Sequence, residues 1–447
     1  MEEFDVFVIG SGVAGQTVAK ACADKGKKVA IADRREFGGT CANRGCDPKK
    51  VLLGVTEIWE EAQNLKGKGI EKLPELNWKK LQKYKRSFTK AIPAATEKNL
   101  KKKGISLYHQ SPEFVDERTL KVEGKTAKAK NIVIATGYEP RKLSFKGSKH
   151  LSTSDDFLNL KKLPKSIIFI GAGYVGMEFA HMAARFGVRV TVLDSGNRPL
   201  SAFDADLVGT LTDYSKKLGI KFIFNSEVKA VEKLRKNFRV SYKSGKKMKS
   251  LTSKMVINTA GRIPAISALN LEKGNVAFNE NGIATNNFLQ SETNPGVYAC
   301  GDVSDNGLPL TPLSGREGYV VSENILNGNR KKLSIPVIPS VVFTLPNIAS
   351  VGYSEKEAKS RFKNIIVKQA SALDWFNAKR INAPAYSYKI ILNERTQKLV
   401  GAHILGPNAG ETINIFAMAI HKGMKADELQ SMLFTYPSLV NDIKNMV

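Results

Sequence analysis

Two cysteines, Cys41 and Cys46, lie close together in a glycine-rich, basic stretch of the chain. Their spacing would let both sulfur atoms meet on one face of a helical turn, as residues i and i+4 or i+5 do. The nearby cations Arg44, Lys49 and Lys50 would favour thiolates by lowering the thiol pKa. A dithiol that opens and closes stores two electrons, so this stretch predicts a redox centre.

The remaining cysteines and the histidines do not complete a metal site. Cys22 falls within a helical segment and Cys300 at a strand end, so both are predicted to be core residues. A structural zinc needs four ligands at characteristic spacing, and the five histidines are scattered. Four cysteines in 447 residues are also too few for a disulfide scaffold. We therefore predict a catalytic pair and no metal.

A βαβ unit precedes the dithiol. An apolar run at residues 4–9 enters a turn with Gly10, Gly12 and Gly15, and the second strand ends at Asp33. Such a turn lets a pyrophosphate approach the backbone at a helix N-terminus, and the acid can accept hydrogen bonds from a ribose. The unit predicts a bound dinucleotide; the alternative is a tight turn in an α/β fold.

A second βαβ unit repeats the pattern in the middle of the chain. Its turn carries Gly171, Gly173 and Gly176, and its second strand ends at Asp194. A carboxylate at this position binds a free 2′-hydroxyl and repels a 2′-phosphate, so NADH is favoured over NADPH. Arg198 is the one nearby cation and keeps NADPH open as an alternative.

Three further strand ends carry small residues, which let a backbone approach a cofactor but also occur at ordinary strand ends. These turns contain Thr136-Gly137, Gly261-Arg262 and Gly301-Asp302. Asp302 could bind a ribityl hydroxyl of a flavin, but standing alone it would be only an aspartate in a turn. Beyond the proline-containing segment at residues 332–340, strands and helices form a region with no cofactor motif. The fold class predicted is α/β, with two Rossmann-like dinucleotide-binding domains and an α+β C-terminal domain.

The net charge of +27 is high, but the lysine runs contain no interleaved aromatics. A solvated surface is the simpler interpretation, so nucleic-acid binding is disfavoured. No apolar run reaches the roughly 18 residues needed to cross a membrane, and no targeting segment is recognisable at the N-terminus. The expected location is the cytoplasm.

Taken together, the motifs resemble the pyridine nucleotide-disulfide oxidoreductases whose active-site cysteines are separated by four residues. The marks, in chain order, are GSGVAG, GGTCANRGCDPKK, ATG, GAGYVGME and YACGDV. The resemblance implies an FAD-dependent NAD(P)H:disulfide oxidoreductase, similar to glutathione reductase or dihydrolipoyl dehydrogenase. Electrons would pass from nicotinamide through flavin to the Cys41–Cys46 disulfide and on to a small disulfide. It also implies a homodimer.

Individual roles follow from the same resemblance. Cys46 would be the thiolate that faces the flavin, and Cys41 the interchange thiol that attacks the substrate. Lys49 and Glu178 match an ion pair beside flavin and nicotinamide, and Tyr174 matches an aromatic gate over the nicotinamide pocket. The cofactor-binding residues implied are Gly10, Gly12, Gly15, Asp33, Gly39, Thr40, Lys50, Thr136, Gly137, Gly171, Gly173, Tyr174, Gly176, Asp194, Gly261, Arg262, Gly301 and Asp302. The domains implied are an FAD-binding domain at 1–145 and 263–331, an NAD(P)-binding domain at 146–262, and a dimerisation domain at 332–447.

The C-terminal end departs from the family pattern. The family has a His-Pro pair whose histidine exchanges protons with the interchange thiol, and here the pair is Tyr436-Pro437. A tyrosine hydroxyl titrates near pH 10, so it is a poor base at neutral pH although it can donate a proton. The family's following glutamate falls at Asn441, with Asp442 next. An alternative is therefore an NAD(P)H-dependent flavin reductase of a quinone or metal ion. A redox-sensing protein without turnover is disfavoured by the intact cysteine pair.

Overall fold

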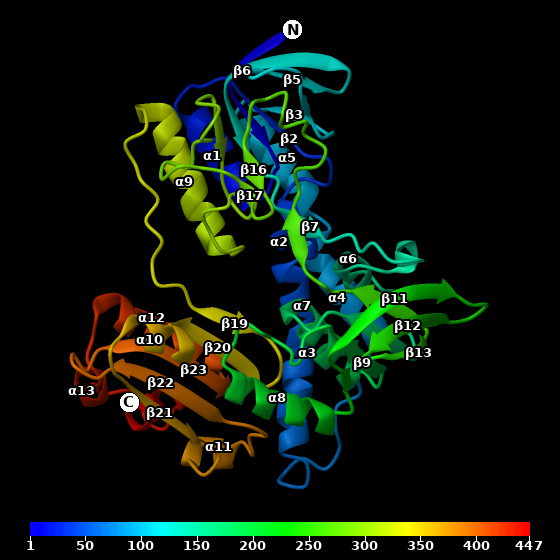
Figure 1. Ribbon diagram of the computed structural model, residues 1–447, viewed down its shortest axis with the longest axis vertical. Coiled ribbons are helices and arrows are strands. Elements are labelled where there is room, and N and C mark those ends of the chain that lie inside the picture. Colours follow the sequence, from blue (N-terminus) through cyan, green and yellow to red (C-terminus); the bar gives the residue numbers. More distant parts are fainter. The chain divides into compact units, whose positions relative to one another are not determined.

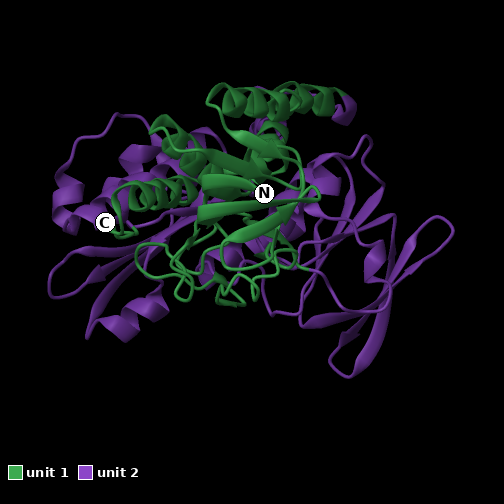
Figure 2. Ribbon diagram, turned by 90° about the horizontal axis from the view of Figure 1, so that it is seen from above, with its two compact units in different colours: residues 1–52, 80–141, 262–335 green, residues 53–79, 142–261, 336–447 purple.

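The structure is a computed structural model that describes residues 1–447, and the chain divides into two compact units (Figure 2). Unit 1 comprises residues 1–52, 80–141 and 262–335, and unit 2 comprises residues 53–79, 142–261 and 336–447. Helices α3 (Cys46–Asn64) and α4 (Trp78–Thr89) each contribute residues to both units. The domain boundaries expected from the sequence stay a prediction.

Unit 1 is built on a seven-stranded sheet in the order β3-β2-β1-β6-β5-β4, with β18 also paired to β6. The strands are β1 (Glu2–Ile9), β2 (Val29–Ala32), β3 (Ser106–Tyr108), β4 (Glu113–Phe114), β5 (Thr119–Val122), β6 (Lys125–Ile134) and β18 (Val297–Ala299). The sheet is parallel from β3 to β6 and at β18, and antiparallel at β5 and β4. The sequence of β6 explains this change, because its first half alternates lysine with small residues and its last residues are all apolar.

The helices of unit 1 join and cover these strands (Figure 1). They are α1 (Val13–Asp24), α2 (Gly39–Arg44), α5 (Ile92–Lys102) and α9 (Thr311–Asn327). Two small ladders, β7 (Tyr138–Pro140) with β15 (Arg262–Pro264) and β16 (Phe278–Asn279) with β17 (Gly282–Ile283), complete the unit. α1 and α9 pack closely, because Gly318 of α9 leaves room for the backbone of Ala14. The first βαβ unit, β1-α1-β2, is confirmed.

Unit 2 contains a second parallel sheet, in the order β10-β9-β8-β14. Its elements are β8 (Ser166–Ile170), α7 (Tyr174–Arg185), β9 (Arg189–Leu193), α8 (Ala205–Lys217), β10 (Lys221–Ile223) and β14 (Met255–Asn258), preceded by η1 (Ser148–His150) and α6 (Ser154–Leu158). A three-stranded antiparallel sheet is inserted before β14 and holds β11 (Ser226–Lys233), β12 (Phe238–Ser244) and β13 (Lys247–Ser253). The second βαβ unit, β8-α7-β9, is therefore also confirmed.

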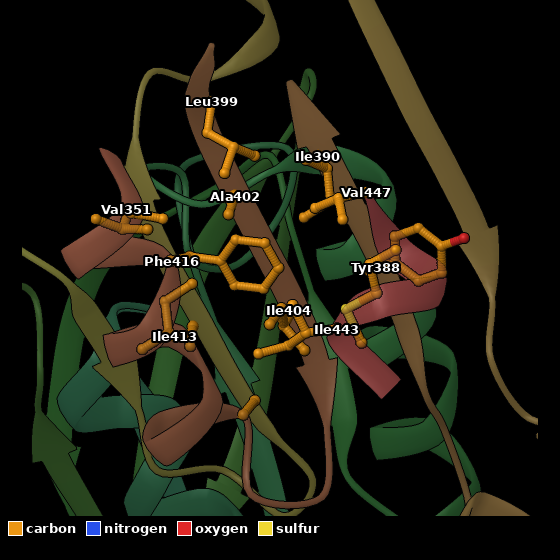
Figure 3. Close-up of a cluster of buried hydrophobic side chains, with 14 of the residues drawn as sticks. Val351, Tyr388, Ile390, Leu399, Ala402, Ile404, Ile413, Phe416, Ile443 and Val447 are labelled. Atoms are coloured by element: carbon orange, nitrogen blue, oxygen red, sulfur yellow. The ribbon is translucent and has the colours of Figure 1, made fainter. Parts of the chain in front are cut away.

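The C-terminal part of unit 2 is a five-stranded antiparallel sheet in the order β19-β20-β23-β22-β21. Its strands are β19 (Ser340–Val342), β20 (Asn347–Gly352), β21 (Ile365–Ser371), β22 (Ser387–Asn393) and β23 (Leu399–Gly406). Its helices are α10 (Glu355–Arg361), α11 (Phe376–Arg380), α12 (Ala409–Lys422), α13 (Ala426–Ser431), η2 (Leu439–Asp442) and α14 (Ile443–Met446). Phe416 of α12 and Ile443 of α14 pack on β-strand residues such as Ile404, which forms the core of this α+β region (Figure 3).

Candidate active site

The β1-α1 turn of unit 1 has the geometry that a dinucleotide loop requires. Gly10 has φ +109°, and a Cβ there would overlap the carbonyl oxygen of Ala135 at the end of β6. A Cβ on Gly15 would overlap the carbonyl oxygen of Gly10. Gly12 is the N-cap of α1, and no side chain caps this helix. The first amides of α1 are therefore positioned to bind an anion at the helix N-terminus.

Asp33 braces this turn. Its Oδ2 accepts hydrogen bonds from the Ser11 amide at 2.9 Å and from Ser11 Oγ at 2.6 Å, and its Oδ1 accepts one from the Arg35 amide at 2.9 Å. Ser11 Oγ in turn accepts a hydrogen bond from the Gly38 amide at 3.0 Å. Ser11 was not predicted as a site residue, and it connects the glycine turn to the segment that carries the dithiol.

The dithiol segment also touches the glycine turn directly. Gly39 has φ +74°, and a Cβ there would overlap Gly12 Cα. A β-carbon on Gly39 would push the two backbones apart, whereas a β-carbon on Gly12 would lie 3.9 Å from Gly39 Cα, which is an ordinary contact. Glycine is therefore required at Gly39. Helix α2, which carries Cys41, therefore begins against the turn that would hold a pyrophosphate.

The sequence prediction that both cysteines share one helical turn is wrong. Helix α2 ends at Arg44, Gly45 has the non-helical values φ −132° and ψ −117°, and α3 begins at Cys46. A Cβ on Gly45 would lie 2.9 Å from the Thr40 carbonyl oxygen and 3.2 Å from Cys41 Cα. The chain thus folds back tightly at Gly45, and this reversal rather than helical periodicity brings the two sulfur atoms together.

The two thiols have opposite electrostatic environments. A hydrogen bond from Cys41, together with Lys49 and Thr311, lowers the pKa of Cys46 to about 6 against the opposing effect of burial. The same hydrogen bond and burial raise the pKa of Cys41 well above the usual range. Cys46 is therefore the thiolate and Cys41 the thiol of the reduced pair at neutral pH.

Two oxygen atoms flank the dithiol. Thr311 Oγ1, at the first residue of α9, lies 4.0 Å from Cys46 Sγ, and Asp47 Oδ1 lies 3.9 Å from Cys41 Sγ. Thr311 was not predicted as a site residue, although the Thr-Pro pair could have indicated that a helix begins here. The prediction that Arg44 supports the thiolates needs correction, because its guanidinium pairs with Glu36 at 2.7 Å. Lys49 is the cation that lowers the pKa of Cys46.

Two more predicted residues line the same side of unit 1. Thr136 Oγ1 is buried and has no hydrogen-bond partner, which is unusual for a buried hydroxyl. Asp302 follows β18, accepts a hydrogen bond from Ser314 Oγ at 3.4 Å, and has its pKa raised by burial despite the nearby Arg262. An unsatisfied hydroxyl and a half-buried carboxylate beside a glycine turn are groups that a polar cofactor would satisfy.

The β8-α7 turn of unit 2 resembles the β1-α1 turn of unit 1, but different residues lie against it. Gly171 has φ +106°, and a Cβ there would lie 2.5 Å from the carbonyl carbon of Thr259. Thr259 Oγ1 donates to the carbonyl oxygen of Gly171 at 2.7 Å. A Cβ on Gly176 would overlap that same carbonyl, whereas a Cβ on Gly173 would meet nothing within 4 Å. This turn therefore has an open face at Gly173, the N-cap of α7.

Asp194 accepts a hydrogen bond from a backbone amide of the second turn, as Asp33 does in the first. Its Oδ2 accepts a hydrogen bond from the Ala172 amide at 2.5 Å, and its Oδ1 accepts one from the Gly196 amide at 2.6 Å. Arg198 is held elsewhere, because its guanidinium donates to four backbone carbonyls. These belong to Pro199, Leu200, Ser201 and Phe203.

Two other predicted residues of unit 2 lie on helix α7. Tyr174 is the first residue of α7 and is half exposed, and Glu178 is buried one turn further on. Glu178 Oε1 accepts a hydrogen bond from the Phe343 amide at 2.9 Å. Lys49 belongs to unit 1 and Glu178 to unit 2, so their ion pair stays a prediction.

The C-terminal residues that replace the family's histidine and glutamate have different environments. Tyr436 is 71 % exposed. Asp442 is buried, accepts hydrogen bonds from Asn377 Nδ2 at 2.8 Å and from the Tyr386 hydroxyl at 3.3 Å, and has its pKa raised by burial. Asn377 also donates to the Ser438 carbonyl at 2.9 Å. Asn377 therefore links Asp442 to Ser438, in the loop that carries Tyr436.

Comparison with known proteins identifies the family. The model for the pyridine nucleotide-disulphide oxidoreductases matches residues 4–318, and the model for their dimerisation domain matches residues 338–447. The chain belongs to the pyridine nucleotide-disulphide oxidoreductase family. It is 30 % identical over 443 residues to the dihydrolipoyl dehydrogenase of Geobacillus stearothermophilus, covering 98 % of this chain and 94 % of the relative. It is 31 % identical over 441 residues to the glutathione reductase of Burkholderia cepacia, covering 98 % and 97 %.

A solved structure of the same class has the same fold. It is the Cu(II) complex of the HOCl-induced flavoprotein disulfide reductase RclA from Escherichia coli, with a TM-score of 0.87, 26 % identity and 99 % of each chain covered. This member of the pyridine nucleotide-disulphide oxidoreductases is thus an FAD-dependent NAD(P)H disulfide oxidoreductase. Its dimerisation domain supports a homodimer. None of its helices combines the length and apolar character that a membrane span requires.

The residues of unit 1 fit FAD. The glycine turn offers uncapped amides to a pyrophosphate, and Thr136 Oγ1 and Asp302 offer polar groups to the rest of the cofactor. The turn at Gly173 in unit 2 fits a pyridine nucleotide in the same way, because its helix end is uncapped and open. When bound, FAD would transfer two electrons between the nicotinamide and the disulfide.

Proposed function

We propose that the enzyme uses NADH to reduce the Cys41–Cys46 disulfide and then a small disulfide substrate. The observation that carries the proposal is the opposite shift of the two thiol pKa values, because an exchange reaction needs one stable thiolate and one thiol that attacks. Two electrons and one proton convert the disulfide to the Cys46 thiolate and the Cys41 thiol. The Cys46 thiolate stays charged because Lys49 and the Thr311 hydroxyl stabilise it.

The substrate half-reaction then proceeds by thiol exchange. Cys41 loses its proton and attacks a substrate sulfur, which breaks the substrate disulfide and releases one thiolate. Cys46 attacks Cys41 next, re-forming the protein disulfide and releasing the second thiolate. The exposed Tyr436 would donate a proton to a departing thiolate, since its hydroxyl is a poorer base than a histidine.

Anaerobic titration with NADH tests the assignment of the thiols. The reduced enzyme should show a long-wavelength charge-transfer band that disappears on acidification with an apparent pKa of about 6. Cys46→Ser should abolish the band, whereas Cys41→Ser should keep it and lose disulfide turnover. A band that survives Cys46→Ser would contradict the assignment.

The preference for NADH over NADPH is part of the proposal. One support is the Asp194 carboxylate at the end of β9, which would repel a 2′-phosphate. The other is Arg198, whose guanidinium donates to backbone carbonyls of its own turn and so is not directed at a 2′-phosphate. Asp194→Ala should lower the ratio of kcat/KM for NADH to that for NADPH by at least about tenfold. An unchanged ratio would refute the preference.

A metal ion is a second candidate acceptor. The similar RclA structure is described as a Cu(II) complex, and Tyr436 weakens the case for efficient disulfide exchange. NADH-dependent reduction of Cu(II) that persists in Cys41→Ser, while disulfide turnover is lost, would favour a metal acceptor. Loss of both activities would favour the disulfide route.

We also propose a cytoplasmic location. The chain has only four cysteines in 447 residues, too few for the disulfide framework typical of secreted domains. Fractionation of cells that express the tagged chain tests this.

A further inference from the structure

A buried carboxyl group, Glu317, lies on α9 beneath the turn that follows β18. Its side chain is 1 % exposed, and no lysine or arginine forms an ion pair with it. Oε2 accepts a hydrogen bond from the Gly301 amide at 2.6 Å, and Oε1 packs so closely on Gly307 that a Cβ there would lie 2.6 Å away. An isolated carboxyl group is rarely buried without a function.

Glu317 belongs to a polar row on one face of α9. Thr311, Ser314 and Glu317 follow at intervals of three residues, so their side chains lie on the same side of the helix. Thr311 Oγ1 lies 4.0 Å from Cys46 Sγ, Ser314 Oγ donates to Asp302 at 3.4 Å, and Glu317 accepts from Gly301. The row therefore joins the thiolate, the carboxylate predicted to hold the ribityl chain, and the turn between them.

We propose that Glu317 is a positioning residue for the flavin: it fixes the Gly301–Asp302 turn, and its ionisation adds a negative charge that makes cofactor reduction harder. The proposal rests on the assignment of Asp302 to the ribityl chain. As a carboxylate, Glu317 repels the negative charge that reduction brings, and taking up one solvent proton removes this repulsion. The midpoint potential of the flavin should therefore depend on the ionisation of a group that does not touch the substrate.

The groups around Glu317 allow its carboxyl group to gain or lose a proton near neutral pH. Burial and, to a smaller extent, the charge of Asp302 raise the pKa of Glu317 to about 7, against the opposing effect of the hydrogen bond from the Gly301 amide. The Cys300 thiol also faces Glu317, and both burial and Glu317 raise the pKa of Cys300 well above its usual value, so it stays neutral. The charge of Arg262 lowers the pKa of Asp302, against the larger effect of burial.

The test measures the midpoint potential of bound flavin by dye equilibration in a background with Cys41→Ser and Cys46→Ser, which leaves flavin as the only redox group. Glu317→Gln mimics the protonated side chain and keeps a carbonyl for the Gly301 amide. Its potential should exceed that of the Glu317 background protein at pH 8.5, and the two values should converge at pH 6. The matched control is Glu323→Gln, on the same helix, which should give no pH-dependent gap.

The outcomes separate this inference from the proposed function. A gap that is absent, or equal at both pH values, overturns the electrostatic role although flavin still binds. Failure of the background protein to bind FAD at all would instead contradict the assignment of the glycine turn and Asp302. Glu317→Ala removes the acceptor for Gly301 and should release FAD faster than Glu317→Gln does. Equal FAD retention in both variants overturns the positioning role, and if Glu317→Ala does not fold, the potentials of Glu317→Gln still decide.

Discussion

The two glycine turns of this chain, β1-α1 and β8-α7, have the same backbone arrangement but differ in the residues that pack against them. In each, an aspartate at the end of the next strand binds the backbone of the turn, and a small-residue segment crosses the first glycine. The turn at Gly12 is covered by Gly39 of the dithiol segment, whereas a Cβ added to Gly173 would have no atom within 4 Å. The first turn is thus built into the redox centre, and the second remains open.

A threonine lies beside each turn, and the two differ in whether their hydroxyl groups have hydrogen-bond partners. Thr259 Oγ1 is satisfied within unit 2 by the carbonyls of Ile170 and Gly171, but Thr136 Oγ1 in unit 1 is buried and unpartnered. A cofactor that stays bound can supply a missing hydrogen bond permanently, whereas a nucleotide that leaves in every cycle cannot. The first turn therefore fits a cofactor that stays bound, and the second fits a nucleotide that exchanges.

Gly39→Ala should have the largest effect on this contrast. The new β-carbon would overlap Gly12 Cα at a residue with φ +74°, so backbone strain and overpacking together should cost roughly 4 kcal/mol of stability and most of the bound FAD. The measurements are the ratio of flavin to protein absorbance and the thermal unfolding midpoint. Gly173→Ala is the matched control, since its Cβ enters open space, and it should retain FAD and weaken only nicotinamide binding. Equal FAD loss in both variants would break the comparison.

Replacing Glu317 should change the pH dependence of stability. Its pKa is about 7 in the folded chain and near 4.5 when exposed, so the folded state binds more protons between these values. The contribution of Glu317 to the free energy of unfolding is therefore highest at low pH. It falls as the pH rises from 4.5 to 7, by a total on the order of 3 kcal/mol. Denaturant unfolding should show this fall in the wild type and a flatter profile in Glu317→Gln. Parallel profiles would show that Glu317 is not strongly perturbed.

Ser11→Ala would make the first turn resemble the second, which has Ala172 at this position. It removes one hydrogen bond to the Asp33 carboxylate and one from the Gly38 amide, so a loss of about 2 kcal/mol is expected. The reciprocal Ala172→Ser should gain little, because no amide equivalent to that of Gly38 covers the second turn. Denaturant midpoints of the two variants check both expectations. A similar change in both would show that the serine hydroxyl does not couple the turn to the dithiol segment.

Much of the site could be predicted because its parts are local. A glycine turn between a strand and a helix, followed by an acid at the next strand end, has one physical solution in an α/β fold, and the structure places Gly10, Gly171, Asp33 and Asp194 accordingly. The fold class was predictable for the same reason. The error at the dithiol arose because Gly45 interrupts a pattern that otherwise has helical spacing.

The partners that were missed are far apart in the sequence. Thr311 is 265 residues from Cys46, and nothing near either residue indicates their approach. Glu317 was not predicted as a site residue, and only the burial of α9 against α1 and the Gly301 turn makes its charge unusual.

The sequence by itself therefore determined the two dinucleotide folds, the dithiol and the family, because these depend on short-range backbone geometry and on residue type. Only the tertiary structure decided that Thr311 lies beside Cys46 and that the carboxyl group of Glu317 is buried. Those properties depend on the distance of each charge from others and from water, and these distances are set by elements that are remote in the chain.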